Sequence, residues 1–137
     1  MYTHIMVPVD LAHVETLDKA LRIAADLAKH YSCAVTYVGV TMSAPTSTAH
    51  NPEEFDQKLA AFAKAQVAEH GHEARSRTEV SHDPTIDLDA TLLKTIHAVG
   101  ADLVVMQSHV PGLADHLWPS NGGTIATRSD ASVLIVR

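Results

Sequence analysis

The segment Ser120-Asn121-Gly122-Gly123 carries the residue types with which a helix start can hold an anion. The hydroxyl of Ser120 can cap the helix, and the residues after it leave backbone amides open with little side-chain bulk. Two glycines also cost roughly 1 kcal/mol each in helix propensity, which disfavours a purely structural role. Pro119, just before this segment, has no N–H to donate, so we expect a phosphate to be held less firmly here than by a glycine turn.

Nucleophilic catalysis needs a hydroxyl or thiol close to a base that a third group orients. Ser108 and His109 are neighbours in the sequence, which does not place the ring against the hydroxyl, and no third group can be assigned. The chain lacks the P-loop motif, GxxxxGK with Ser or Thr after the lysine, so a P-loop nucleotidase is not supported. It also lacks the GxGxxG motif, so a Rossmann dehydrogenase is not supported either. Asp87 and Asp89 fall on different faces of a predicted helix and share no ligand spacing with a histidine, so we predict no metal site.

Length and composition indicate one globular domain over residues 1–137, because 46% of the residues are hydrophobic and 19% are charged. The formal net charge is −6, and no basic cluster exceeds Arg75-Ser76-Arg77, which argues against nucleic acid as a partner. We expect no membrane insertion and no export, because no apolar run reaches the roughly 18 residues of a spanning helix and the first residues lack a basic segment. Cys33 is the only cysteine, so the reducing cytoplasm is the expected location.

Strand and helix patterns alternate along the whole chain. The predicted strands are His4–Val9, Cys33–Thr41, Glu73–Val80, Asp102–Met106 and Ser132–Val136. Helices are predicted over residues 17–28, 52–70, 84–99 and from about residue 120. Strict alternation predicts an α/β fold, an open Rossmann-like parallel sheet with helices on both faces. Ligands of such sheets bind at the carboxyl ends of the strands, here Asp10, residues 39–41 and residues 107–123.

Local signals add structural expectations within these elements. Gly39, inside a predicted strand, indicates that another element approaches the backbone closely. Asn51, Pro52 and Glu54 predict a helix start with a capping box, after an irregular loop over residues 42–50. The residues expected in the core include Met6, Met106 and, along one helix, Ile86, Leu88, Leu92, Leu93, Ile96 and Val99. Glu73–Val80 alternates polar and small residues, which is typical of an edge strand.

Four segments in this order and spacing resemble the universal stress protein family, and together they span the chain. They are Val7-Pro8-Val9-Asp10, residues 104–111 (VVMQSHVP), residues 117–123 (LWPSNGG) and residues 132–137 (SVLIVR). The nearest variant of the family has a Ser-His-x-Pro turn, which is here Ser108-His109-Val110-Pro111. The resemblance implies a sheet with strand order 3-2-1-4-5, a homodimer paired through the last strand, Ser132 to Val136, and an ATP or AMP site.

The resemblance also implies a set of binding residues. Asp10 would hold the ribose or the adenine edge, Val40 would meet adenine through its backbone, and the segments at 107–110 and 119–121 would take the phosphates. The full set is Pro8, Val9, Asp10, Val40, Met106, Gln107, His109, Val110, Pro119, Ser120, Asn121 and Gly122. The family has glycine where this chain has Gln107, Val110 and Pro119, so weaker phosphate binding is expected.

Three functions stay open from the sequence. The first is a stress protein in which an adenine nucleotide acts as a regulatory ligand, with Asp10 in contact with it. The second is a nucleotide-free homodimeric interaction module, in which Asp10 caps only the first turn after its strand. The third is a slow ATPase or phosphotransferase, which would need Mg²⁺ bridged by the phosphates.

Overall fold

The structure is a computed structural model that describes residues 1–108 and 121–137. Five parallel strands form one sheet: β1 (His4–Pro8), β2 (Ala34–Thr41), β3 (Glu73–Val80), β4 (Leu103–Gln107) and β5 (Ser132–Val136). Their order is β3-β2-β1-β4-β5, which confirms the predicted fold class and strand order. Glu73–Val80 lies at one edge, as its alternating pattern predicts, and β5 lies at the other.

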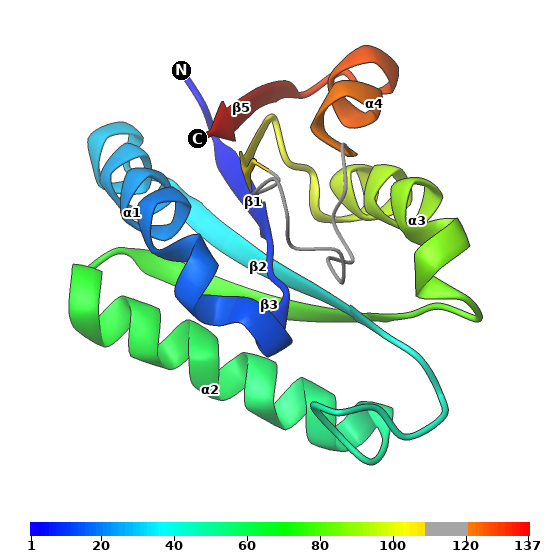
Figure 1. The fold of residues 1–137 in the computed structure, drawn as a ribbon. Coiled ribbons are helices and arrows are strands. Elements are labelled where there is room, and N and C mark those ends of the chain that lie inside the picture. Colours follow the sequence, from blue (N-terminus) through cyan, green and yellow to red (C-terminus); the bar gives the residue numbers. More distant parts are fainter. Residues whose placement is uncertain (109–120) are drawn as a thin grey trace.

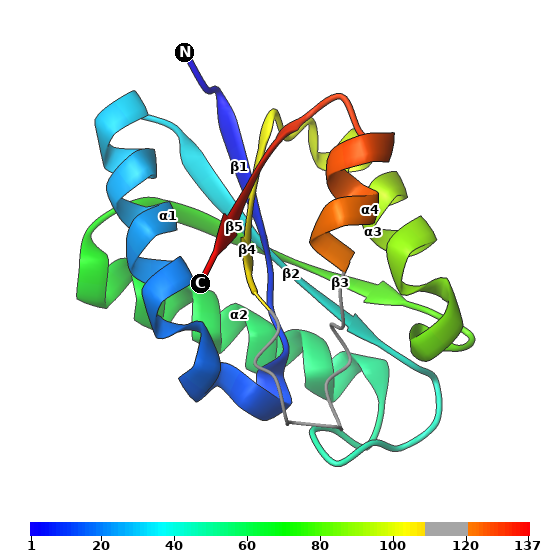
Figure 2. The same cartoon turned by 45° about the horizontal axis from the view of Figure 1, so that its top comes forward.

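Helices cover both faces of this sheet. They are η1 (Leu11–Leu17), a 3-10 segment, followed by α1 (Asp18–Tyr31), α2 (Pro52–His70), α3 (Pro84–Val99) and α4 (Asn121–Arg128). α1 and α2 pack on one face and α3 and α4 on the other (Figures 1 and 2). The sequence analysis predicted the α-helices within a few residues but missed η1, which turns the chain between β1 and α1. No helix among the described residues is long and apolar enough to cross a membrane.

The face under α1 and α2 holds the larger core cluster, which includes Tyr37, Phe55 and Leu59. α2 approaches β2 so closely at Gly39 that a Cβ atom there would lie 2.6 Å from Cε1 of Phe55. The close approach predicted from Gly39 is therefore confirmed, and its cause is the Phe55 ring. Glycine is required at this position for packing, not for a special backbone angle.

The face under α3 and α4 holds a second, smaller cluster built on Leu88, Leu92 and Ile96 of α3. Met6 and Met106 are buried in it, as predicted. The prediction for Ile86 is wrong, because its side chain is 79% exposed. It stands two residues before Leu88, and two residues turn about 200° around a helix, so Ile86 lies on the opposite side from the buried stripe.

The start of α2 follows the capping prediction with one difference. The side chain of Asn51 accepts a hydrogen bond of 2.8 Å from the N–H of Glu54, and Pro52 occupies the first helical position. The Glu54 carboxylate, however, accepts from the N–H of His50 at 3.1 Å, one residue before the position of a capping box. Hydrogen bonds from the His50 backbone and side chain and from Lys58 lower the pKa of Glu54 to about 2.

A buried polar pair lies between β2 and the start of β3. The hydroxyl of Tyr37 and Nε2 of His72 are 2.8 Å apart, and both side chains are buried. Nδ1 of His72 has no hydrogen-bond partner in the described part of the chain. Burial lowers the pKa of His72, and the nearby His70 and Lys29 lower it further, so folding favours the neutral form of this ring.

We predict that Gly39→Ala destabilises the protein by roughly 1–3 kcal/mol, the usual cost of overpacking a core. The new methyl group would overlap the buried ring of Phe55, which would have to leave its packed position. Urea unfolding measures the effect. Gly123→Ala is the matched control, because no atom lies within 4 Å of a Cβ at that position. Equal stability of Gly39→Ala and the parent protein would contradict the packing described here.

We also predict that the protein loses stability as the pH falls below about 6.5, the ordinary pKa of histidine in an unfolded chain. The unfolded chain takes up a proton at His72 that the folded protein resists, so acid favours unfolding until the pH passes the lowered folded-state pKa. His72→Gln, which keeps a polar group for Tyr37 but does not titrate, should make the loss shallower in thermal unfolding between pH 7.5 and pH 5. Replacing the exposed His30 by Gln should leave the loss of stability unchanged. If the melting temperatures of the parent, His72→Gln and His30→Gln fell equally with pH, His72 would not be the source of the loss.

Candidate functional site

The chain turns sharply out of the sheet at Asp10, directly after β1. The Asp10 carboxylate accepts a hydrogen bond of 3.0 Å from the N–H of Ala12 and lies 2.9 Å from Nδ1 of His13. His13 has a non-helical conformation, and its carbonyl accepts the hydroxyl of Thr16 at 2.7 Å. Asp10 therefore does cap the first turn, as one of the two predicted roles requires. Its carboxylate is buried but keeps lone pairs free, since each oxygen can accept more than one hydrogen bond.

β2 continues past the point where β1 ends. Pro8 pairs with Val38, and the N–H of Val9 donates to the carbonyl of Val38 at 2.8 Å, so Val38 directs its polar groups toward β1. In a parallel strand, successive residues direct their N–H and C=O groups to opposite neighbouring strands. Val40, two residues after Val38, therefore directs its N–H and C=O toward the β1 side. Thr41 points the other way, where its carbonyl accepts from Ser81. In the described part of the chain no strand lies beside this edge of Val40.

The loop after β2 is irregular, as predicted, and forms the outer wall of the site. The hydroxyl of Thr46 accepts hydrogen bonds from the N–H groups of Thr48 and Ala49, and the N–H of Thr46 donates to the carbonyl of Ala49 at 2.8 Å. Nζ of Lys58, on α2, donates to the carbonyl of Thr48. These contacts hold a loop with no regular hydrogen-bonding pattern in a defined shape.

A cavity of about 220 Å³ opens between the turn at Asp10, the end of β2 and this loop. Its lining consists of Val9, Asp10, Leu11, Ala12, Val40, Thr41, Met42, Thr46, Ser47, Thr48, Phe55 and Pro84. A shallower hollow continues from it along Ser47 and Thr48 to Lys58. The walls are mostly apolar, and Asp10 is the single acidic residue among the described residues that line the cavity. Such a cavity suits a flat apolar ring system that also carries groups able to donate hydrogen bonds.

The structure brings three of the predicted site residues to this cavity, namely Val9, Asp10 and Val40. Pro8 ends β1 just before them. Thr46, Ser47 and Thr48 were missed, because an aperiodic loop gives no sign of which way it folds. His13 was missed as well, although a histidine three residues after a capping aspartate is a signal that could have been used.

The end of β4 forms a second part of the predicted site. Met106 is buried in the core cluster under α3, so its side chain packs within the fold. Nε2 of Gln107 donates to the carbonyl of Val136 at 3.2 Å, and its Oε1 is buried without a partner in the described part of the chain. The N–H of Ser108 donates to the same carbonyl at 2.6 Å. The Gln107 side chain therefore adds a hydrogen bond between the ends of β4 and β5.

The remaining predicted residues lie at the start of α4 or outside the described residues. His109, Val110, Pro119 and Ser120 are outside them. Asn121 begins α4, one residue after the predicted start. A Cβ atom at Gly122 would lie 2.6 Å from Cδ1 of Ile135 on β5, so the Ile135 side chain would have to shift to accept a larger residue there. Gly122 thus has a packing contact beside the anion-binding role predicted for it, whereas Gly123 has open space around it.

The described residues define which polar groups the cavity can offer. The described residues contain no group of three His, Cys, Asp or Glu side chains that could hold a metal ion. The cavity lining offers hydroxyl groups and one carboxylate, which already accepts the Ala12 N–H. The described lining therefore combines hydrogen-bond acceptors and hydroxyl groups with an apolar surface.

Comparison with known proteins agrees with the fold. The profile of the Universal stress protein family matches residues 1–137, the whole chain. The chain belongs to the universal stress protein family. Universal stress protein G of Shigella flexneri is 28% identical over 148 residues, and the alignment covers all of both chains.

Solved universal stress proteins share the fold. One in complex with cAMP has a TM-score of 0.71 at 19% identity, with 99% of this chain and 97% of that chain covered. Another, from Archaeoglobus fulgidus in complex with dAMP, has a TM-score of 0.67 at 18% identity, with coverages of 99% and 98%. A third, from Arabidopsis thaliana with AMP bound, has a TM-score of 0.65 at 15% identity, with coverages of 98% and 90%. At these identities the likeness shows the fold of the chain.

Proposed function

We propose that this universal stress protein binds an adenine nucleotide, ATP or AMP, as a regulatory ligand. The observation that carries the proposal is the cavity at the ends of β1 and β2, where the buried carboxylate of Asp10 and the open backbone edge of Val40 line one space. Three proteins of the same fold bind cAMP, dAMP and AMP, which supports an adenine nucleotide over other ring systems.

Adenosine matches the polar groups of this cavity. The adenine edge presents one hydrogen-bond donor and one acceptor side by side, and the N–H and C=O of a single strand residue, Val40, offer the complementary pair. A ribose hydroxyl can donate to a free lone pair of Asp10, a charge-assisted bond that is stronger than a neutral one. The apolar side chains of Val9, Met42 and Phe55 supply walls for the ring.

The phosphate end of the ligand is proposed to lie against residues 107–110 and the start of α4. The amides at Asn121 to Gly123 are the first of a helix, where anions bind favourably. Gln107 and Pro119 replace two glycines of the family pattern, and the Gln107 side chain is committed to Val136. We therefore propose modest phosphate affinity, and a ligand that is held as a signal and not rapidly hydrolysed. Mg²⁺ would enter only with ATP, bridged by its phosphates.

We propose that the protein acts in the cytoplasm as a homodimer that pairs through β5. β5 is an edge strand, and Leu134 and Ile135 on it are 38% and 39% exposed. An exposed apolar edge invites pairing with a second copy through a twofold axis. The same surface supports the second candidate function, a nucleotide-free interaction module. The single buried thiol of Cys33, with no second cysteine to pair with, fits a reducing compartment.

The nucleotide proposal is tested at Asp10. Asp10→Ala should weaken binding of both AMP and adenosine by roughly 1.5–3 kcal/mol, the range for hydrogen bonds to a charged group. Asp10→Asn keeps an oxygen for the Ala12 N–H and so preserves the turn, but removes the charge, and it should weaken both ligands as well. Isothermal titration calorimetry measures the affinities.

The exposed Asp18→Ala is the matched control, because Asp18 lies on α1 in an ion pair with Arg22 and does not line the cavity. If Asp10→Asn binds both ligands as the parent does, Asp10 only caps the turn. If the parent binds neither AMP nor adenosine, the nucleotide-free module is the better account.

The dimer proposal is tested at Leu134. Leu134→Lys should shift the protein from dimer to monomer in sedimentation equilibrium at tens of micromolar (~20 µM, where modest dimers persist by mass action). Val136 is unsuitable for this test, because its side chain is buried and a lysine there would disturb the core. A parent protein that is monomeric, or a Leu134→Lys variant that stays dimeric, would count against pairing through β5.

A further inference from the structure

The imidazole of His13 holds the Asp10 carboxylate from outside the cavity. Nδ1 of His13 lies 2.9 Å from Oδ2 of Asp10, and the N–H of Ala12 donates to Oδ1 at 3.0 Å. One contact on each oxygen fixes the plane of the carboxylate. Asp10 and Ala12 line the cavity, whereas His13 is not among the described residues that line it. Contact between His13 and a ligand in the cavity therefore runs through Asp10.

The His13 ring can change its charge without losing this contact. An ionised carboxylate only accepts hydrogen bonds, so Nδ1 carries the hydrogen that lies between the two side chains. Nε2 is then the nitrogen that gains a proton when the ring becomes charged. The side chain of His13 is 35% exposed, compared with 5% for Asp10, so solvent can supply that proton.

A bound nucleotide would bring a second negative charge close to Asp10. The described residues that line the cavity include this one carboxylate and no basic side chain. Lys58, in the neighbouring hollow, already pairs with Glu54 at 3.3 Å and donates to the carbonyl of Thr48. A buried carboxylate covered by an anionic ligand needs a compensating positive charge. The His13 ring can supply it, because it contacts the carboxylate directly.

We propose that His13 is a positioning residue that makes an anionic adenine nucleotide bind more tightly at pH 6 than at pH 8. The inference rests on the proposed function and adds regulation by pH to it. The neutral ring orients Asp10 toward the ribose. The charged ring also offsets the charge of Asp10, which favours a ligand with a phosphate over the neutral nucleoside. Histidine changes its charge between about pH 5 and 8, so the response falls in the physiological range.

The other charged groups of the neighbouring elements have contacts of their own. Asp18 pairs with Arg22 at 3.0 Å at the start of α1, and His50 lies 2.9 Å from Glu54 of α2. The full set on η1, α1, α2, the turn before α3 and the end of β5 is Glu15, Asp18, Lys19, Arg22, His50, Glu54, Lys58, His82, Asp83 and Arg137. Of these residue types, histidine is the one that ordinarily titrates between pH 6 and 8. His50 and His82 remain in a variant of His13, so a comparison with the parent isolates the His13 ring.

The test measures affinities for AMP and adenosine at pH 6 and pH 8 by isothermal titration calorimetry, in the parent and in His13→Asn. Asparagine places an amide N–H where Nδ1 lies, so it keeps the donor to Asp10 but cannot gain a charge. The ratio of parent to variant affinity for AMP should rise about two- to fivefold from pH 8 to pH 6, as expected for one partly exposed charge pair. The same ratio for adenosine should not rise. The ionisation of the AMP phosphate near pH 6 affects both proteins equally.

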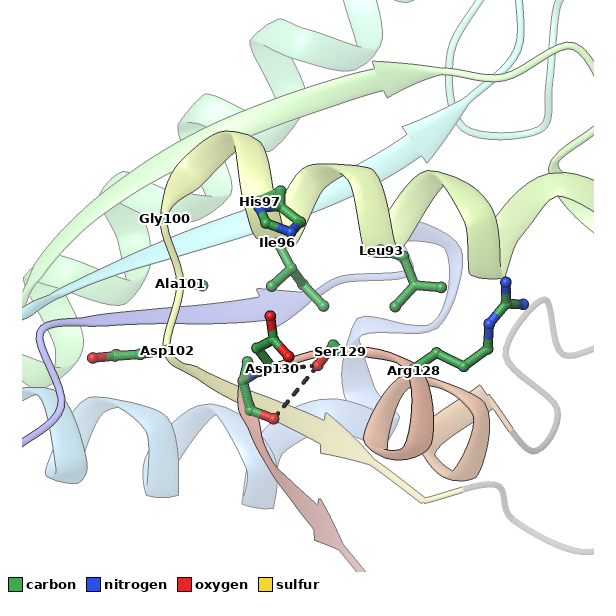
Figure 3. Close-up of a pocket in the computed structure, with 10 residues that line it drawn as sticks. Leu93, Ile96, His97, Gly100, Ala101, Asp102, Arg128, Ser129 and Asp130 are labelled. Carbon is green, nitrogen blue, oxygen red and sulfur yellow. Dashed lines mark hydrogen bonds between the residues drawn. The ribbon is translucent and has the colours of Figure 1, made fainter.

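Two further variants complete the test. His13→Ala removes the donor, so at pH 8 it should weaken both ligands about two- to tenfold, whereas His13→Asn should bind them as the parent does. His97→Asn is the matched control. His97 is an exposed histidine of α3 that lines a cavity of about 320 Å³ before β4 and β5, at the opposite end of the sheet from Asp10 (Figure 3). This variant should bind both ligands as the parent does at both pH values.

The outcomes separate this inference from the proposed function. If the parent and His13→Asn bind AMP with the same pH dependence, regulation by His13 is overturned and the nucleotide site stands. A ratio that rises equally for AMP and adenosine also overturns it, because charge compensation requires a phosphate. If His13→Ala binds both ligands as the parent does at pH 8, the positioning role is overturned. A parent protein that binds neither ligand at either pH overturns the proposed function and this inference together. Circular dichroism verifies that each variant keeps the fold.

Discussion

The hydrogen bond from the N–H of Ala12 to the carboxylate of Asp10 ends β1 and turns the chain into η1. Because the central strand stops there, β2 extends beyond it, and the backbone of Val40 borders a cavity with no strand beside it in the described part of the chain. The same turn directs η1 and α1 back across the face of the sheet. The cavity, its polar lining and the packing of α1 all depend on where β1 ends.

The packing differs between the two faces of the sheet. Under α1 and α2, glycine at position 39 lets the Phe55 ring approach the strand, which brings Phe55 into both the core and the cavity wall. Under α3 and α4, Gly122 gives room to Ile135 of β5. The polar contacts of Gln107 and Ser108 with Val136 hold the ends of β4 and β5 together. Glycine thus allows close packing at position 39, whereas at Gly123 it has open space around it.

Much of the fold could be predicted because its signals are local and repeat. Alternation of apolar strands with amphipathic helices predicts the parallel sheet, Asn51 and Pro52 predict the start of α2, and Gly39 predicts a close approach. The strand order came from the family resemblance, since local patterns do not say which strands pair. Ile86 was misplaced because hydrophobicity alone ignored its angular position relative to Leu88 on the helix.

The site was less predictable than the fold. Asp10 and Val40 follow from the rule that ligands bind at the carboxyl ends of parallel strands, and the structure brings both to one cavity. The wall formed by Thr46 to Thr48 depends on hydrogen bonds within an aperiodic loop, and the partnership of Asp10 with His13 depends on a kink in η1. Neither leaves a periodic pattern in the sequence. Similarly, the role of Gln107 is set by β5, which lies far along the chain.

The central claim is that the cavity beside Asp10 holds the adenosine part of a nucleotide. A crystal structure of the protein grown with AMP tests it most directly. The account predicts the ribose within hydrogen-bond distance of the Asp10 carboxylate and the adenine edge against the backbone of Val40, with Phe55 in the wall. A complex with AMP bound elsewhere on the molecule, or a cavity that contains only water at saturating AMP, would contradict it.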